Sequence, residues 1–145
     1  MSDQTYTIAE LLALPDDALN VLAAELRGWH AKYFIDGTGF WCGGGKILYE
    51  VVIGSLTHED WPGGPQGITR PHWSPADDRN QSGELLEWLA DQGFSVSIGR
   101  DRFIIVNVGI SHSDYGRIGA HEKRWPRAET VAFCAAMLAM EGRLK

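Results

Sequence analysis

The chain has 145 residues, of which 44% are hydrophobic and 22% are charged, an ordinary composition for one globular domain with a buried core. The formal net charge of -6 argues against general attraction to nucleic acid or to anionic lipid. No apolar run approaches the roughly 20 residues of a membrane span, and the first residues lack a signal-peptide pattern. Cys42 and Cys134 are too few for a disulfide framework, so we expect a cytoplasmic protein.

The N-terminal third predicts two helices followed by short strands. Thr7 and Glu10 have the spacing of a capping box, which predicts a short helical extension over residues 7–14. Pro15 interrupts that helix, and a longer one follows until Gly28. Beyond it we expect strands separated by an Asp-Gly hairpin signal and by a flexible glycine break, at residues 30–35, 38–41 and 46–53 with the break at 42–45.

Residues 54–80 form a long irregular loop in this prediction. The segment is rich in proline and glycine and contains Trp61 and Trp73. Loops of this length are uncommon in compact domains and are usually functional or mobile. Two interpretations remain open: the tryptophans fold back as a lid over the core, or they form a binding surface.

The segment 82–110 predicts a helix, a strand, a tight turn at 99–102 and a second strand. Leu85, Trp88 and Leu89 share one helix face, which ends at Gly93. In the first strand, Phe94, Val96 and Ile98 alternate with serines, as in a strand with one buried face.

Residues 111–125 are predicted as a second polar segment, before an alanine-rich helix that starts at Pro126 and closes at Gly142. Apolar stripes on helices and alternating strands of this kind pack as layers. The sequence therefore predicts one α+β domain over residues 1–145. We expect an α/β/α layered sandwich, with helices covering a mostly antiparallel sheet of four or five strands.

Several blocks of the chain resemble the phage ABA sandwich domain family. They are DAL at 17–19, AAELRGW at 23–29, WSPAD at 73–77, LLEWL at 85–89, GFSV at 93–96 and ETVAFCAAML at 129–138. The resemblance implies an α/β/α sandwich encoded by a phage or prophage and working in the host cytoplasm. It transfers no catalytic motif. The polar segments 54–72 and 111–125 depart from the family pattern, so we expect any specialised activity there.

Residues that could carry catalysis or bind a metal lack the required spacing. The histidines at 58, 72, 112 and 121 match no zinc signature. There is no Gly-x-Ser-x-Gly elbow, and Cys42 lies beside three glycines with neither an activating base nor a P-loop spacing. We therefore predict no enzyme, no metal and no cofactor. A metal-dependent hydrolase and an RNA-binding domain are the weaker alternatives.

A basic cluster leads into the last helix and consists of Arg117, Lys123, Arg124 and Arg127. The first N–H groups of that helix have no partners within it and favour an anion. The cluster is either a solvated turn that offsets nearby glutamates or a contact site for an acidic surface. We predict a non-catalytic binding protein whose contact residues are Trp61, Trp73, Tyr115, Arg117, Lys123, Arg124, Trp125 and Arg127. The expected partner is a host protein or complex, for instance a defence complex that it inhibits. The alternative is sequestration of a small phosphorylated ligand such as a signalling nucleotide. We expect no membrane or nucleic-acid partner.

Overall fold

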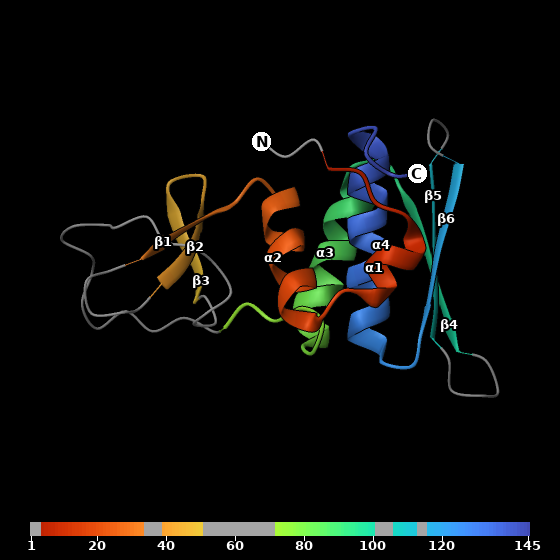
Figure 1. Cartoon of the computed structure of the whole chain (residues 1–145), viewed down its shortest axis with the longest axis horizontal. Coiled ribbons are helices and arrows are strands. Elements are labelled where there is room, and N and C mark those ends of the chain that lie inside the picture. Colours follow the sequence, from red (N-terminus) through yellow and green to blue (C-terminus); the bar gives the residue numbers. More distant parts are fainter. Residues whose placement is uncertain (1–3, 34–38, 51–71, 101–105, 113–115) are drawn as a thin grey trace.

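The computed structural model describes residues 4–33, 39–50, 72–100, 106–112 and 116–145 (Figure 1). The helices in this part of the chain are α1 (Ile8–Ala13), α2 (Asp16–Leu26), α3 (Arg79–Asp91) and α4 (Trp125–Met140). The strands are β1 (His30–Tyr33), β2 (Gly39–Gly43), β3 (Lys46–Glu50), β4 (Ser95–Arg100), β5 (Val106–His112) and β6 (Gly116–Glu122). None of the helices in these ranges is both long and apolar enough to cross a membrane.

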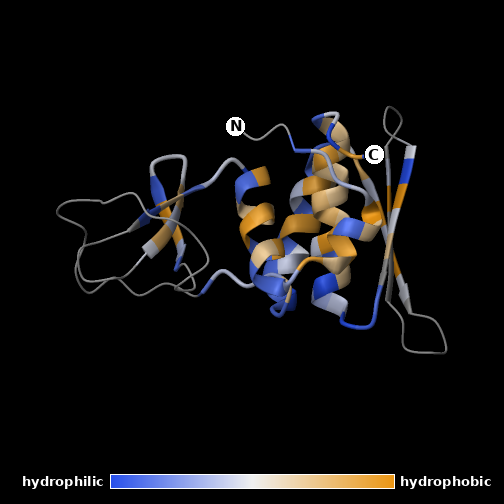
Figure 2. Cartoon of the chain, viewed as in Figure 1, coloured by the Kyte–Doolittle hydropathy of each residue, from blue (hydrophilic) through white to orange (hydrophobic). Residues whose placement is uncertain are grey.

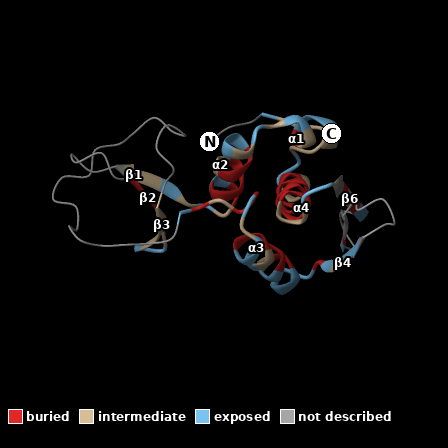
Figure 3. Cartoon of the chain, turned by 90° about the horizontal axis from the view of Figure 1, so that it is seen from below, coloured by how far each residue is buried: buried red, intermediate tan, exposed pale blue. Residues whose placement is uncertain are grey.

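The strands form two antiparallel sheets of three, in the orders β1-β2-β3 and β4-β5-β6. The predicted α+β class is therefore confirmed, but the prediction of a single sheet of four or five strands is wrong. In Figures 1 and 3 the helices lie between the two sheets. In each sheet, strands that are consecutive in the sequence pair with one another, and no strand from the other half of the chain takes part.

The predicted capping box of the first helix and the glycine ends of the other three are confirmed, but α3 begins at Arg79 and not at the predicted residue 82. Thr7 and Glu10 form a capping box, with each backbone N–H donating to the other's side chain at 3.1 Å. The glycines at 28, 93 and 142 have φ values of 80°, 95° and 72° and follow α2, α3 and α4. At the end of α2, the N–H of Trp29 donates to the carbonyl of Ala24 at 3.1 Å, as in a Schellman motif.

The predicted glycine break at residues 42–45 is shorter in the structure, because Cys42 and Gly43 belong to β2. Gly44 and Gly45 connect β2 to β3 with φ values of 60° and 76°. Positive φ at both positions of a two-residue connection is the type I′ geometry, which matches the twist of the paired strands.

The prediction for residues 111–125 also needs correction, because most of this polar segment forms strands. Ser111 and His112 end β5, and residues 116–122 form β6, which pairs with β5 from Val106↔Glu122 to His112↔Gly116. In β6, buried Ile118 and Ala120 alternate with exposed Arg117. The predicted turn at 99–102 is also partly wrong, since β4 continues to Arg100.

Helix α4 forms the centre of the core. It contacts α1, α2, α3, β5 and β6, and every residue from Arg127 to Leu138 is buried. Figure 2 shows the concentration of apolar residues in this helix, and Figure 3 shows its buried position. Its alanines allow neighbouring elements to approach closely. The sequence predicted one alanine-rich buried face, whereas the structure buries this part of α4 on all sides.

The predicted apolar positions around α3 and β4 are mostly confirmed. Leu85 and Leu89 have 0% exposure, whereas Trp88 is only partly buried. Phe94 is buried, but Ile98 is 39% exposed. Because β4 is an edge strand, a neighbouring strand shields it on one side only.

Candidate functional site

Arg127, predicted as a contact residue, is directed into the protein. Its side chain is 9% exposed, and its Nε lies 3.1 Å from Glu122 Oε2. Nη1 donates to Asp16 Oδ1 at 2.5 Å, and Nη2 donates to the carbonyls of Leu12 and Leu14 at 2.7 and 2.6 Å. Each of its three nitrogens therefore has an internal acceptor. Its assignment to an external contact surface is wrong.

Arg124 is committed to the same carboxylate while remaining half-exposed. Its Nη2 donates to both oxygens of Asp16, at 2.5 and 2.7 Å, and its Nη1 donates to Asp77 at 2.7 Å. Burial alone would raise the pKa of Asp16, but hydrogen bonds and charge from the two arginines outweigh it, so this pKa is lowered. We call these five residues, Asp16, Asp77, Glu122, Arg124 and Arg127, the Asp16 network. With three carboxylates to two guanidiniums, it is not an anion site.

Trp73 belongs to the core, and its assignment to an exposed contact surface is wrong. It is 2% exposed, and its indole Nε1 donates to the backbone carbonyl of Asn20 at 2.8 Å. The Asn20 side chain in turn accepts from the N–H of Ala76 at 2.9 Å. Of the two interpretations for the loop tryptophans, the folded-back one holds for Trp73. Trp61 lies outside the described residues.

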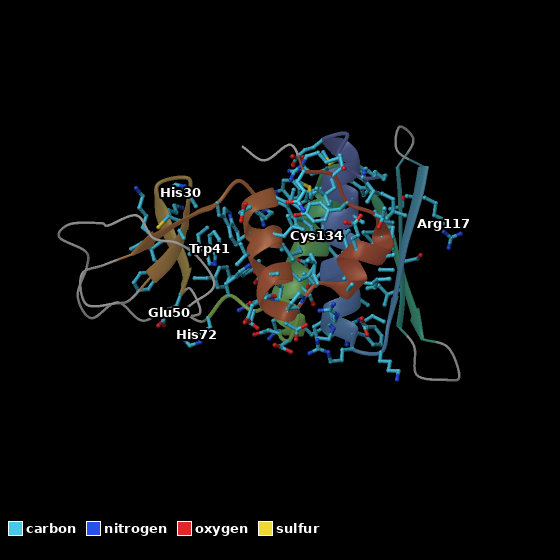
Figure 4. All side chains as sticks on the ribbon, in the orientation of Figure 1. His30, Trp41, Glu50, His72, Arg117 and Cys134 are labelled. Carbon is cyan, nitrogen blue, oxygen red and sulfur yellow. The ribbon has the colours of Figure 1, made fainter. Side chains whose placement is uncertain are left out.

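The other predicted contact residues do not form one surface. Arg117 is exposed on β6 and points away from the helices (Figure 4). Lys123 is also exposed. Trp125 is partly buried at the start of α4, where the guanidinium of Arg79 lies 3.8 Å from its ring centroid. Tyr115 lies outside the described residues.

A different cluster emerges where the first sheet meets the helices. Trp73 lies 4.8 Å from the ring of Trp29 and 4.7 Å from that of Tyr49, measured between centroids. The Tyr49 hydroxyl donates to Glu84 of α3 at 2.7 Å. Figure 4 shows Trp41, also buried, between this sheet and α2. These contacts attach the β1-β2-β3 sheet to the helical body.

Arg27 lies close to two indole rings at this junction. Its guanidinium carbon is 4.9 Å from the ring centroid of Trp29 and 4.9 Å from that of Trp88, within cation–π distance of both. Its Nε is buried and has no hydrogen-bond partner in the described part of the chain. Burial lowers the pKa of Arg27, while the nearby Tyr49 and Glu84 oppose that effect. We call Arg27, Trp29, Tyr49 and Trp88, all of them partly exposed, the Arg27 surface.

Local structure holds this arrangement in place. Arg27 is the C-cap of α2, and the Schellman motif at Gly28 turns the chain so that Trp29 folds back beside it. A Cβ on Gly43 would lie 2.5 Å from Cδ1 of Trp29, so only glycine leaves room for the indole there. Trp88 packs edge-on against Phe133 of α4, with centroids 6.2 Å apart. Both rings therefore rest on the core.

Sequence reasoning missed this site because it treated Arg27-Gly28-Trp29 as a helix end and Trp88 as part of a buried face. The available signal was an arginine and a tryptophan on either side of the glycine that ends α2. Their meeting with Trp88, some sixty positions away, is a product of tertiary structure.

The described residues contain no group of three or more His, Cys, Asp or Glu side chains that could hold a metal ion. His72 Nε2 lies 3.3 Å from Glu50 Oε2, which forms a surface pair at the end of β3 (Figure 4). His58 lies outside the described residues.

Comparison of the chain with protein-family models, with curated proteins and with solved structures found no match.

Proposed function

We propose that this chain is a non-catalytic binding protein that contacts a partner protein through the Arg27 surface. One observation carries the proposal: the partly exposed guanidinium of Arg27 lies 4.9 Å from the ring centroids of two partly exposed indoles and forms none of the ion pairs found among the described residues. Tryptophan, tyrosine and arginine are the residue types that contribute most binding energy at protein interfaces. All three occur here together.

Rigidity supports this proposal. Binding usually costs about 0.5–1.5 kcal/mol for each flexible side chain that becomes ordered. Arg27 is already confined by Trp29 and Trp88, and both rings contact buried aromatic residues of the core. The conformational entropy of the Arg27 side chain is therefore lost during folding, and binding of a partner would not lose it again.

The resemblance to a phage family makes a host protein the partner that we propose, with inhibition of a host defence complex as its specific form. Sequestration of a phosphorylated ligand has less support. That alternative needs free cations beside exposed aromatics, but Arg124 and Arg127 bind Asp16, and Trp73 is buried. No observation favours it over protein binding.

The test is partner capture from host lysate with the intact chain, its Arg27→Met variant and its Arg79→Met variant. Methionine keeps apolar bulk beside the indoles but removes the charge and the N–H donors. Arg79 is a matched control because it also stacks on a tryptophan, Trp125, and its side chain is 59% exposed. Circular dichroism and thermal unfolding would establish that all three proteins are folded.

We expect the wild type and Arg79→Met to recover the same partner, and Arg27→Met to lose it. Equal recovery by all three folded proteins, or recovery by none, would contradict the proposal.

A further inference from the structure

Strand β4 pairs with β5 alone among the described strands, so its other side is a free edge, which we call the β4 edge. We infer that the β4 edge receives an extended segment of another protein, which pairs with β4 as a further strand of the sheet. That segment carries apolar side chains and a lysine or arginine on the face that meets α3. The inference goes beyond the function proposed above and does not rest on the Arg27 surface.

The β4 edge lacks the features that keep edge strands from pairing. Natural edge strands carry charged residues, prolines or bulges that discourage a further strand. Of the other edge strands in the described sheets, β1 contains Lys32, β6 contains Arg117 and β3 begins at Lys46. Residues 95–99 of β4 include neither a charged residue nor a proline, and β4 pairs with β5 in unbroken register. This edge is therefore open to another strand.

An apolar side chain is exposed at the β4 edge. Ile98 is 39% exposed, and it is the one large hydrophobic residue in the described ranges that is classed as exposed. Val96 lies on the same face of β4 and is partly buried, opposite the fully buried Ile110 of β5. The apolar face of the sheet thus continues to the β4 edge. A strand added there would cover Ile98.

Helix α3 leaves room beside such a strand. It packs on α4 and on β4 (Figure 3). Leu89 points into the core, and Trp88 lies to one side of it, near Arg27 of α2. With about 3.6 residues per turn, Gly83 and Ala90 lie on the other side, which is left for β4. Ala90 is exposed, and a Cβ added to Gly83 would meet nothing within 4 Å, so side chains of the added strand have space here.

Charge beside the β4 edge indicates the chemistry of the segment. Glu87 and Asp91 of α3 are exposed and take part in none of the ion pairs found among the described residues. Glu87 is four positions from Gly83 and three from Ala90, so it lies beside them on the helix surface. A lysine or arginine on the facing side of the added strand would be attracted to Glu87, whereas an acidic residue would be repelled. The segment is therefore apolar at Ile98 and basic beside Glu87.

A second copy of this chain does not suit the β4 edge. Two copies that paired through β4 around a twofold axis would present the same surfaces to each other. With the helices of both copies on one side of the joined sheet, α3 would face α3, and Glu87 and Asp91 would face the same acidic residues. Each copy also has a formal net charge of -6. Like charges at an interface oppose pairing, and a basic segment of another protein avoids this repulsion.

The experiment titrates a short capped peptide, Thr-Val-Thr-Lys-Thr-Val-Thr, into the intact, isotope-labelled chain and follows the backbone amides of the chain by NMR. The valines and the lysine of this peptide share one face of an extended strand. A second peptide has glutamate in place of lysine, and a third has proline in place of both valines.

Three variants of the chain are titrated in the same way. Ile98→Lys places a charge at the β4 edge, and Glu87→Lys reverses the charge beside it. Glu25→Lys is the matched control, because it makes the same charge change at an exposed position of α2. Circular dichroism would establish that all three variants are folded.

We expect the lysine peptide to shift the amide resonances of β4 along a saturating curve and to slow their hydrogen exchange. The glutamate peptide should bind about fivefold more weakly, as expected for one exposed charge pair. The proline peptide should leave the β4 resonances in place, because proline has no N–H to donate. Glu87→Lys should reverse the preference between the lysine and glutamate peptides, Ile98→Lys should abolish binding of both, and Glu25→Lys should behave as wild type.

Unchanged β4 resonances with the lysine peptide, or equal binding of the lysine and glutamate peptides to the wild type, would overturn the inference. A dimer of the free chain that Ile98→Lys dissociates, measured by sedimentation, would also overturn it, since the β4 edge would then belong to a second copy. The peptide titration reports on β4, whereas partner capture reports on Arg27, so either proposal can fail while the other stands.

Discussion

Arg127 Nη1 donates to Asp16 Oδ1 at 2.5 Å, a bond between residues 111 positions apart in the chain. The same guanidinium donates to the carbonyls of Leu12, in the last turn of α1, and of Leu14, which follows α1 and precedes Pro15. Helix ends leave carbonyls without partners in the helix. Arg127 of α4 satisfies two carbonyls at the end of α1 and holds the start of α2 in place.

The two arginines of the Asp16 network should differ in their effect on stability. We expect Arg127→Met to lower the free energy of unfolding by about 3 kcal/mol, since it leaves the partly buried carbonyls of Leu12 and Leu14 and the carboxylate of Glu122 without this partner. Arg124→Met should cost less than about 1 kcal/mol, because that side chain is 47% exposed. Urea unfolding of both variants measures the difference. Equal losses of unfolding free energy in the two variants would show that burial does not set how much each arginine contributes to stability.

Gly43 should be required for the position of Trp29. A Cβ at residue 43 would meet the indole at 2.5 Å, so we expect Gly43→Ala to lower the free energy of unfolding by about 1–3 kcal/mol. The displaced ring should also shift the Arg27 Nε–Hε resonance. Gly83→Ala is the control, since an added Cβ there meets nothing within 4 Å, and helix propensity predicts a gain of about 0.5–1 kcal/mol. An unchanged Arg27 resonance in Gly43→Ala would contradict this account.

Glu129 should make stability depend on pH. Burial raises its pKa, against the hydrogen bond from Ser82 and the charge of Arg79. The folded state therefore binds this proton more tightly than the unfolded state does. The resulting destabilisation is fully present above the folded pKa and disappears as pH falls below the unfolded value of about 4.3.

In the wild-type protein the Ser82 hydroxyl donates to Glu129 Oε1 at 2.9 Å. Glu129→Gln keeps an oxygen that can accept this bond and removes the buried charge. We expect the variant to unfold at a higher temperature than wild type at pH 7, with the difference shrinking as pH approaches about 4. Glu87→Gln, at an exposed position of α3, is the control. A Glu129→Gln protein that is less stable at pH 7 would show that the pair with Arg79 outweighs desolvation.

The two thiols should be unreactive in the folded protein. Cys134 is 0% exposed and Cys42 is 5% exposed, and burial raises the pKa of both. We expect a thiol reagent at pH 8 to modify Cys42 first, through local opening of its sheet, and Cys134 only after global unfolding. Mass spectrometry of partly modified protein gives the order. Rapid modification of Cys134 under native conditions would contradict the central burial of α4.

Local features of this protein were predictable from the sequence. The Thr7–Glu10 capping box, the glycine helix ends and the buried positions Leu85 and Leu89 all depend on residues within a few positions of one another. Strand β6 was missed because its alternation is carried by small side chains such as Ala120 among polar ones. The division into two sheets was missed because strand pairing is not encoded in any single segment.

The sequence by itself determined the capping box that starts α1, the glycines that end the other helices and the apolar positions of α3, because capping and periodicity are short-range properties of the chain. Only the tertiary structure decided which cations form internal ion pairs. Arg127 pairs with Asp16 from the opposite end of the chain, whereas Arg27 lies 4.9 Å from the ring centroid of Trp88 and forms none of the ion pairs found among the described residues. Exposure and ion pairing depend on groups that folding brings together over long separations, and a pattern of neighbouring residues carries no record of them.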